Sequence, residues 1–405
     1  MNRYISQYII KDLHRKMVFV GGPRQVGKTT LSIAVAGTIN EKHTLLLGDN
    51  TSMTFLDGRT MSMPSRQTYF NWDVDEDRTA ILKKQWDQKA PLIIFDELHK
   101  YPRWKRWIKG VYDIRPVHQN YLVTGSAKLD VYKQGGDSLL GRYHYWRLHP
   151  LTLDELPDNI DKNDAYQRLL MVGGFPEPFL QNDEREARRW RRERMDRILR
   201  EDVRDLEQIR QLPLLDLLLR ALRERVGSMI TYSNLATDLQ IAPNTVKNWL
   251  DLIERMYIAF SIKPYTKKIA RAIQKPPKVY FYDNADVINA QGPRLENLVA
   301  THLLKRLHFI EDYFGYRCSL HYIRDKDGRE VDFVTIIDDV VHDLIEVKES
   351  DSEISTALKY YKNLLKPKHT TQLVSQLPRS FDQEGIRVTT PIEFFTNAPW
   401  ETTSG

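Results

Sequence analysis

The feature that most constrains this chain is the change of pattern across residues 17–39. The apolar run MVFV at 17–20 leads into the glycine-containing segment GGPRQVGKTT at 21–30, and then into the stretch TLSIAVAGTI at 30–39. A short apolar run that ends at glycine is typical of a buried strand, and the longer stretch has the length of a helix. Strand, glycine-containing loop and helix in this order build α/β proteins. The chain is therefore predicted to begin with an α/β domain.

Three more apolar runs follow, with stretches between them that are long enough for helices. They are TLLLGD (44–49), PLIIFDE (91–97) and NYLVTGS (120–126). Short continuous apolar runs indicate strands that are buried on both faces, as in a parallel sheet covered by helices. We expect a doubly wound parallel sheet over residues 1–150.

The loop at residues 22–29, GPRQVGKT, fits the P-loop pattern G-x-x-x-x-G-K-[ST] in full. Its glycines let backbone N–H groups approach phosphates, and the helix N-terminus adds partial positive charge. We expect the Lys28 ammonium to reach the β- and γ-phosphates of ATP and the Thr29 hydroxyl to ligate Mg²⁺. The expected nucleotide contacts are Gly22, Pro23, Arg24, Gln25, Val26, Gly27, Lys28, Thr29 and Thr30.

Polar residues also end the two later strands. Asp96 and Glu97 follow LIIF, so Asp96 is expected to hold Mg²⁺ through water and Glu97 to orient or deprotonate the attacking water. Ser126, with Thr124 behind it, is a candidate for contact with the γ-phosphate or that water, although Thr-Gly-Ser is also ordinary turn chemistry. With Lys28, these residues predict an ATP hydrolase.

Length and composition limit the class of protein. The 405 residues favour two to four domains, and the net charge of +6 is compatible with nucleic-acid binding without establishing it. A single cysteine, Cys318, excludes an intrachain disulfide and a cysteine-based zinc site. No run approaches the ~18 apolar residues of a membrane span, and the first residues lack a signal-peptide pattern. We therefore expect a cytoplasmic protein without membrane association.

The middle of the chain divides into two predicted parts. Residues 151–225 are expected to form a helical lid or linker, and residues 226–275 a winged helix-turn-helix. The second helix of that module would expose four polar residues on its first turns, the positions from which a recognition helix reaches DNA. A basic strand region would follow as the wing, although such modules also serve only for packing. The predicted DNA contacts are Asn244, Thr245, Lys247, Asn248, Lys267 and Lys268.

Residues 276–395 return to strands and form a predicted smaller α/β domain. Glu296 opens a helix, Asp332 begins a strand, and Glu346 and Lys348 lie two apart on the next strand, so they share a face. This is the order of a PD-(D/E)XK nuclease core. Glu296, Asp332 and Glu346 would ligate Mg²⁺ or Mn²⁺, and Lys348 would help to activate water. Glu330 is an alternative to Asp332, and such folds also occur as inactive binding platforms.

Five segments together carry a resemblance that covers nearly the whole chain. They are GGPRQVGKTT, FDELHK, LVTGS, SLLGRYHYWRLHPLTLDEL and GGFPEP. They resemble a family of bacterial and archaeal AAA-type ATPases in which a P-loop domain is joined to a C-terminal restriction-endonuclease-like domain. The resemblance implies that Arg142, in Leu-Leu-Gly-Arg, acts as an arginine finger on a neighbouring subunit, or alternatively forms a structural salt bridge. A finger role implies homo-oligomers, which ATP would promote.

These observations support one leading hypothesis and two alternatives. The leading one is an ATPase that binds and processes DNA, with a metal-dependent nuclease centre at its C-terminal end. The first alternative is a nucleotide-dependent switch that binds DNA or protein and has an inactive nuclease-like domain. The second alternative is an ATPase that remodels proteins.

Overall fold

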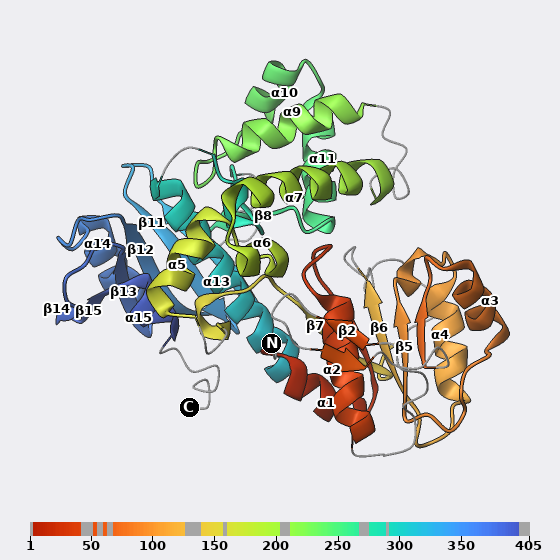
Figure 1. Ribbon diagram of the computed structural model, residues 1–405. Helices are drawn as coiled ribbons and strands as arrows, with labels where there is room; N and C mark the ends of the chain where they lie inside the picture. Colours follow the sequence, from red (N-terminus) through yellow and green to blue (C-terminus); the bar gives the residue numbers. More distant parts are fainter. Residues whose placement is uncertain are drawn as a thin grey trace. The chain divides into compact units, whose positions relative to one another are not determined.

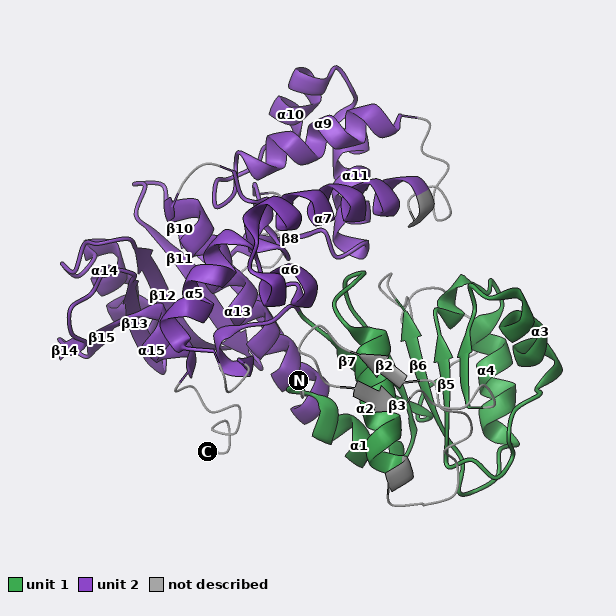
Figure 2. Cartoon of the chain, in the orientation of Figure 1, with its two compact units in different colours: residues 1–149 green, residues 150–405 purple. Residues whose placement is uncertain are grey.

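The computed structural model describes most of the chain as two compact units, residues 1–149 and 150–405 (Figures 1 and 2). The described residues are 3–41, 52–54, 60–62, 68–125, 139–156, 160–202, 211–266, 275–288 and 291–396. The predicted end of the first domain at residue 150 stays a prediction. The further predicted division at residues 225 and 275 stays a prediction.

The first unit contains a five-stranded sheet with the order β4-β5-β6-β1-β7, in which every neighbouring pair is parallel. The α/β fold with a parallel sheet is thus as predicted. The strand expected at 44–49 lies outside the described residues. The strands are β1 (Met17–Gly21), β4 (Tyr69–Asn71), β5 (Leu92–Asp96), β6 (Asn120–Gly125) and β7 (Tyr143–Arg147).

Helices cover both faces of this sheet because its strands are apolar on both sides. Phe19 and Phe95 pack with Trp104 and Ile108 of α4, while α1 and α2 contact the strands through other residues. The carboxyl ends of the parallel strands meet at one edge, where ligands bind in such folds. The helices are α1 (Ser6–Leu13), α2 (Lys28–Glu41), α3 (Asp75–Lys83) and α4 (Trp104–Asp113), and β2 (Ser52–Thr54) pairs separately with β3 (Thr60–Ser62).

The second unit begins with helices, and the role of residues 151–225 as a lid or linker stays a prediction. GGFPEP at 173–178 contains the end of the turn between α5 and α6 and the first residues of α6, and Gly173 in it has a φ of 85°, a conformation that favours glycine. A Cβ at Gly173 would clash with a carboxylate oxygen of Asp283. The described elements are α5 (Lys162–Met171), α6 (Pro176–Gln181), α7 (Glu184–Arg197), a π-helical turn (Ile198–Asp202) and α9 (Leu212–Arg223).

Two helices then follow where the helix-turn-helix is predicted. They are α10 (Tyr232–Leu239) and α11 (Pro243–Arg255), joined by a short turn in which Gln240 has a φ of 54°. The segment expected as a wing forms β8 (Ala259–Pro264) and β9 (Lys278–Phe281), an antiparallel pair. Because β8 also pairs with β10, these strands belong to the C-terminal sheet and are not a separate two-stranded ribbon. Buried and more exposed residues alternate along most of β8, and every residue of β9 is buried. Both patterns suit strands of a sheet that is covered by a helix.

The C-terminal sheet has eight strands in the order β14-β15-β13-β12-β11-β10-β8-β9. The helix α13 (Gln291–Phe314) contacts β9 to β12, and α14 (Thr356–Leu365) contacts β11 and β12. The strand and helix positions agree with the predicted α/β composition, while the restriction-endonuclease-like assignment stays a prediction. The remaining elements are β10 (Cys318–Arg324), β11 (Glu330–Ile337), β12 (Val340–Lys348), β13 (His369–Val374), β14 (Phe381–Gln383), β15 (Ile386–Thr389) and α15 (Pro391–Thr396).

Candidate functional site

The loop between β1 and α2 is fixed by its backbone and by one buried arginine. Gln25 and Gly27 have φ angles of 64° and 96°, and the Gly27 carbonyl accepts the first α2 hydrogen bond, from Leu31 N at 2.9 Å. Arg3 donates through Nη1 to the Val26 carbonyl at 2.8 Å and through Nη2 to the His149 carbonyl at 2.5 Å. Arg3, which the sequence did not point to, therefore ties the loop to the end of the unit.

Lys28 is the first residue of α2, and its side chain is folded back over the loop. Its ammonium donates to the Gly22 carbonyl at 3.0 Å and to the Pro23 carbonyl at 2.8 Å, and the residue is only 6% exposed. An ammonium held at this position lies beside the backbone that would contact the phosphates. The geometry suits the predicted phosphate-binding role of Lys28.

Asp96, at the end of β5, is the centre of a hydroxyl network. Its Oδ2 accepts from Thr29 Oγ1 and from Tyr69 OH, each at 2.7 Å, and its Oδ1 accepts a short hydrogen bond from Thr124 Oγ1. The pKa of Tyr69 is raised by burial and by the neighbouring Asp96 carboxylate. A carboxylate and a threonine hydroxyl in contact are a donor set that suits Mg²⁺, so Thr29 and Asp96 fit the predicted metal role.

Glu97 follows Asp96 in a left-handed conformation, with a φ of 56°. Its Oε2 lies 3.7 Å from Nδ1 of His99 and 3.9 Å from Nζ of Lys100. Burial lowers the pKa of His99, and His99 Nδ1 has no hydrogen-bond partner among the described residues. Lys100 is held mainly by Asp73, at 2.6 Å. His99 is therefore a candidate site residue beside Glu97 that the sequence analysis did not single out.

The C-terminal candidate residues come together around a buried lysine. Nζ of Lys278, on β9, lies 2.6 Å from Glu330, 3.2 Å from Glu296 and 3.7 Å from Asp332. Its side chain is only 3% exposed. Burial disfavours the charged form of Lys278, but the three carboxylates outweigh that effect and raise its pKa. Lys278 therefore supplies positive charge to the carboxylates for which a metal ion was predicted.

Glu346 and Lys348 lie beside this cluster at the end of β12. The Lys348 ammonium is 2.8 Å from Oε1 of Glu346, and Val347 N donates to Oδ2 of Asp332 at 2.9 Å. The buried Oε2 of Glu346 has no hydrogen-bond partner among the described residues. Burial, followed by repulsion from Asp332, raises the pKa of both Glu346 and Glu296 to about 7. The predicted residues are thus gathered, with one oxygen that a cation would satisfy.

Comparison with known proteins separates three segments. Residues 14–157 match a family model described as an AAA domain, residues 163–292 a domain of unknown function, DUF8612, and residues 291–395 another domain of unknown function, DUF4143. The first match contains the P-loop, the Asp96 network and all five strands of the parallel sheet. Residues 14–157 are therefore similar to an AAA domain, which supports an ATP-binding function for this part of the chain. The two other matches assign no activity to the rest of the chain.

Individual relatives add little about function. Uncharacterized proteins of Mycobacterium bovis and Mycobacterium tuberculosis are each 24% identical over 274 residues, which cover 67% of this chain and 56% of theirs. This chain therefore spans about half the length of these curated relatives. DnaA of Aquifex aeolicus bound to AMPPCP has a TM-score of 0.30 at 12% identity, covering 62% of this chain and 86% of that one. The STAND protein PH0952 of Pyrococcus horikoshii has a TM-score of 0.27 at 12% identity, covering 78% and 48%.

Two predicted residues of the AAA-type domain need separate mention. Ser126 lies outside the described residues, so only Thr124 behind it is placed. Arg142 forms a two-pronged ion pair with Asp113, with Nε 2.7 Å from Oδ1 and Nη2 3.2 Å from Oδ2. The salt bridge that the sequence left open as an alternative is present within the unit. The role of Arg142 as a finger stays a prediction.

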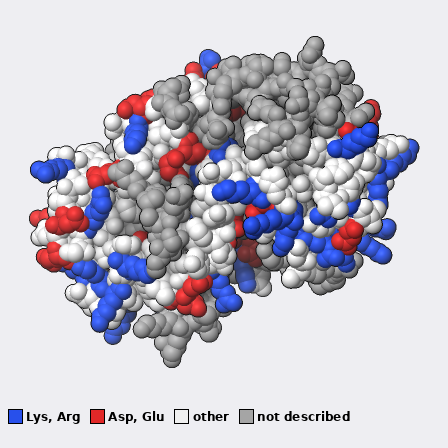
Figure 3. Space-filling view, turned by 90° about the horizontal axis from the view of Figure 1, so that it is seen from below, with Lys and Arg blue, Asp and Glu red and all other residues white. Residues whose placement is uncertain are grey.

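The predicted DNA contacts on α11 are at its surface. Asn244, Lys247 and Asn248 are exposed and Thr245 is partly exposed, whereas Val246 packs inward. Lys267 and Lys268 lie outside the described residues. On the face drawn in Figure 3, basic side chains are spread over the surface with acidic side chains among them. In the part of the chain that the structure describes, no helix is long and apolar enough to span a membrane.

Proposed function

We propose that the protein hydrolyses ATP at the β1–α2 loop and uses the nucleotide cycle to control DNA binding by its second unit. The observation that carries the ATPase half is the contact of Asp96 with Thr29 and Thr124, at the ends of two neighbouring parallel strands. It joins the P-loop helix to the strand ends where a triphosphate would lie.

Each residue has a distinct role in this proposal. Lys28 moves its ammonium from the loop carbonyls to the β- and γ-phosphates, and Thr29 and Asp96 hold Mg²⁺. When bound, Mg²⁺ offsets the negative charge of the phosphates. Glu97 orients the attacking water and accepts its proton, and Ser126 contacts the γ-phosphate or that water. His99 lies beside Glu97, with its Nδ1 3.7 Å from Oε2 of the glutamate.

ATP turnover by purified protein tests this assignment. Glu97→Gln should bind ATP normally but hydrolyse it about 10²–10⁴-fold more slowly, because a general base contributes that much. Lys28→Ala should lose binding itself. The control is Glu76→Gln, which changes an exposed glutamate of the same unit and should leave turnover unchanged. Wild-type turnover by Glu97→Gln would contradict the proposal.

Arg142 is proposed to complete the site of a neighbouring subunit in an ATP-promoted homo-oligomer. It would have to leave Asp113 to do so, which a phosphate with greater negative charge favours. The test mixes Arg142→Ala with Glu97→Gln, each inactive alone. A shared site would regain turnover, because one interface would combine an intact Glu97 with an intact Arg142. An oligomer that forms without any recovery would place Arg142 in a structural role.

The exposed first turns of α11 are proposed to contact the DNA backbone and bases. Lys247 is the cation among them, so Lys247→Ala should weaken binding and reduce the slope of log affinity against log salt by about one. The control is Lys83→Ala, an exposed lysine of the first unit. Binding should differ between ATP and ADP. DNA binding that does not depend on salt, or an equal loss of DNA binding in Lys247→Ala and Lys83→Ala, would favour an ATPase that acts on proteins.

A metal-dependent nuclease is the second candidate, and the partnerless oxygen of Glu346 favours it. Glu296, Asp332 and Glu346 would hold Mg²⁺ or Mn²⁺, and Lys348 would stabilise the attacking water. Cleavage ranks second because the Lys278 ammonium already lies within 3.7 Å of two of these carboxylates. Labelled DNA should be cut by wild type and not by Asp332→Ala or Lys348→Ala. Binding of DNA without cleavage would instead support a nucleotide-dependent switch that binds DNA.

A further inference from the structure

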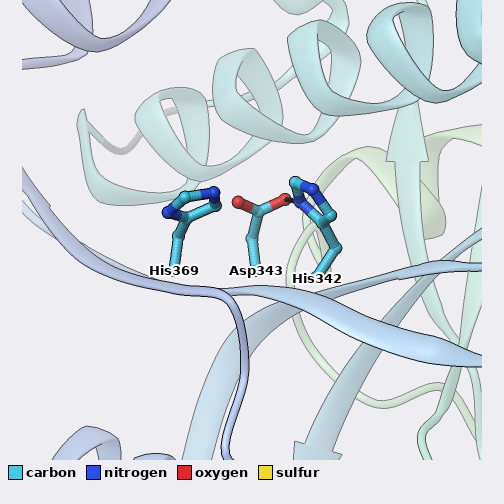
Figure 4. Close-up of side chains that lie close together, drawn as sticks. All are labelled: His342, Asp343 and His369. Carbon is cyan, nitrogen blue, oxygen red and sulfur yellow. Dashed lines mark hydrogen bonds and ion pairs between the residues drawn. The ribbon is translucent and has the colours of Figure 1, made fainter. Parts of the chain in front are cut away.

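Three side chains outside both candidate centres point toward one another where β13 begins beside β12 (Figure 4). They are His342, Asp343 and His369, and one possible ligand atom from each lies within 4.8 Å of the others. Two imidazoles and one carboxylate are a common ligand set for zinc. None of these residues takes part in the proposed ATPase, DNA-binding or nuclease chemistry.

The sheet brings them together through its register and one bulge. Asp343 and His369 are direct partners on the parallel strands β12 and β13, so their side chains lie on the same face. Between β11 and β12 the pairing moves from Thr335↔Asp343 to Ile336↔Val341, which leaves His342 as an extra residue. Successive strand residues normally point to opposite faces, and a bulge redirects one of them. His342 and Asp343 can therefore serve one site.

Neighbouring groups hold the carboxylate in place. Oδ2 of Asp343 accepts from Thr335 Oγ1 at 2.5 Å and lies 3.0 Å from Nδ1 of His342, and Asp343 N donates to Thr335 Oγ1 at 3.0 Å. The hydrogen bonds with Thr335, which is not itself a proposed ligand, orient the Asp343 carboxylate for metal binding. The centroids of the two imidazole rings are 5.3 Å apart. Asp343 and His342 are only 8% and 9% exposed, whereas His369 is exposed and leaves one side open to solvent.

We propose that His342, Asp343 and His369 bind one Zn²⁺ ion, with water as the fourth ligand on the exposed side of His369. Ligand atoms about 2.0–2.2 Å from a tetrahedral Zn²⁺ lie roughly 3.4 Å apart, so only small side-chain rotations are needed. The imidazoles favour Zn²⁺ over Mg²⁺, which prefers oxygen ligands. Arg306 of α13 interacts electrostatically with Asp343, and its positive charge opposes the metal. The ion would connect β12 to β13.

Zinc binding by the full-length, nucleotide-free protein tests the proposal. Titration by calorimetry in excess Mg²⁺ keeps carboxylate-only sites saturated, so that a histidine site is measured. Wild type should bind one Zn²⁺ per chain, and Co²⁺ should give the visible absorption of a tetrahedral site. His369→Ala removes an exposed side chain that should not affect folding, and it should reduce affinity by at least about tenfold.

Two further variants distinguish this site from general histidine binding. Thr335→Val leaves all three ligands but removes the hydrogen bond to Asp343, and should weaken zinc binding by about 10–100-fold. His118→Ala removes an exposed histidine of the first unit and should have no effect. The proposal is overturned if His369→Ala and wild type bind zinc equally, or if wild type shows no saturable binding.

Discussion

Replacing Lys278 by methionine tests whether this lysine is the counter-ion of the C-terminal carboxylates. The change keeps an unbranched side chain but removes the charge that lies 2.6 Å from Glu330 and 3.2 Å from Glu296. At an effective dielectric constant of about 20, the closest contact alone corresponds to about 6 kcal/mol of gross attraction. Desolvation offsets much of this, and breaking buried ion pairs costs about 3–5 kcal/mol. We expect a local destabilisation in that range.

The loss of stability in Lys278→Met should depend on pH, and the pKa of Glu296 determines the direction. The pKa of Glu296 is about 7 in the folded chain, against an ordinary value of 4.5. Its contribution to stability is therefore complete below about pH 4.5 and is lost as the pH rises through 7. Without Lys278 the folded pKa rises further. Lys278→Met should consequently be closer to wild type at about pH 5 than at about pH 8. Part of the cost should persist at both pH values, because contact with Lys278 and Arg324 lowers the pKa of Glu330 despite its burial.

Amide hydrogen exchange on peptides from β9 and β11 measures the local destabilisation in Lys278→Met. It does not assume that the two units unfold together. The expected loss of protection at alkaline pH is roughly a hundredfold to several-thousandfold. Lys275→Met, which changes an exposed lysine close by in sequence, is the matched control. Mg²⁺ should restore part of the protection only in Lys278→Met, because the carboxylates could then hold it. Equal, pH-independent effects of both variants would refute the reasoning.

Three further changes have expected outcomes. Tyr69→Phe removes one hydroxyl donor to Asp96 and should raise the Mg²⁺ concentration for half-maximal ATP turnover about tenfold, which a Mg²⁺ titration measures. Burial lowers the pKa of His302 to about 3 from 6.5, so stability present above pH 6.5 falls as the pH falls through that value. At pH 4.5 the loss should be roughly 3 kcal/mol, and His302→Gln should remove it from acid unfolding curves. Gly173→Ala should lower the melting temperature, since a left-handed residue with a Cβ costs about 1–3 kcal/mol before the clash is counted.

Local patterns predicted the strands and the loop around residues 17–30, 92–96 and 120–125. The β1–loop–α2 unit, Asp96 at the end of β5 and Thr124 on β6 could be placed because each depends on a few consecutive residues. Parallel pairing then brings strand ends together. Tyr69 gave no such signal, because it begins a strand of three residues and meets Asp96 only through the sheet.

Strands with little apolar content were missed. The segment YHYWR at 143–147 forms β7, but only Trp146 in it is buried, so it lacks the continuous apolar run of a central strand. Its partly exposed position at the sheet edge explains that composition.

In the second unit, the sequence located the carboxylates and missed their cation. Glu296, Asp332 and Glu346 lie on the helix and strands predicted for them. Lys278 was part of the predicted boundary between a basic wing and the next domain, and nothing local indicates that it is buried among acids. Charge compensation across three separate elements depends on tertiary contacts, which periodicity does not report.

The position of β1 has a consequence for how the protein is made. Its two neighbours are β6 and β7, with Val18 paired to Leu122 and Met17 to Tyr143. At translation rates of about 5–20 residues per second, β1 waits roughly 6–25 s before both partners have been synthesised. The strand that emerges first is thus among the last to be enclosed. Until residue 147 has left the ribosome the P-loop has no complete sheet behind it, so ATP can stabilise the first unit only near the end of that unit's synthesis.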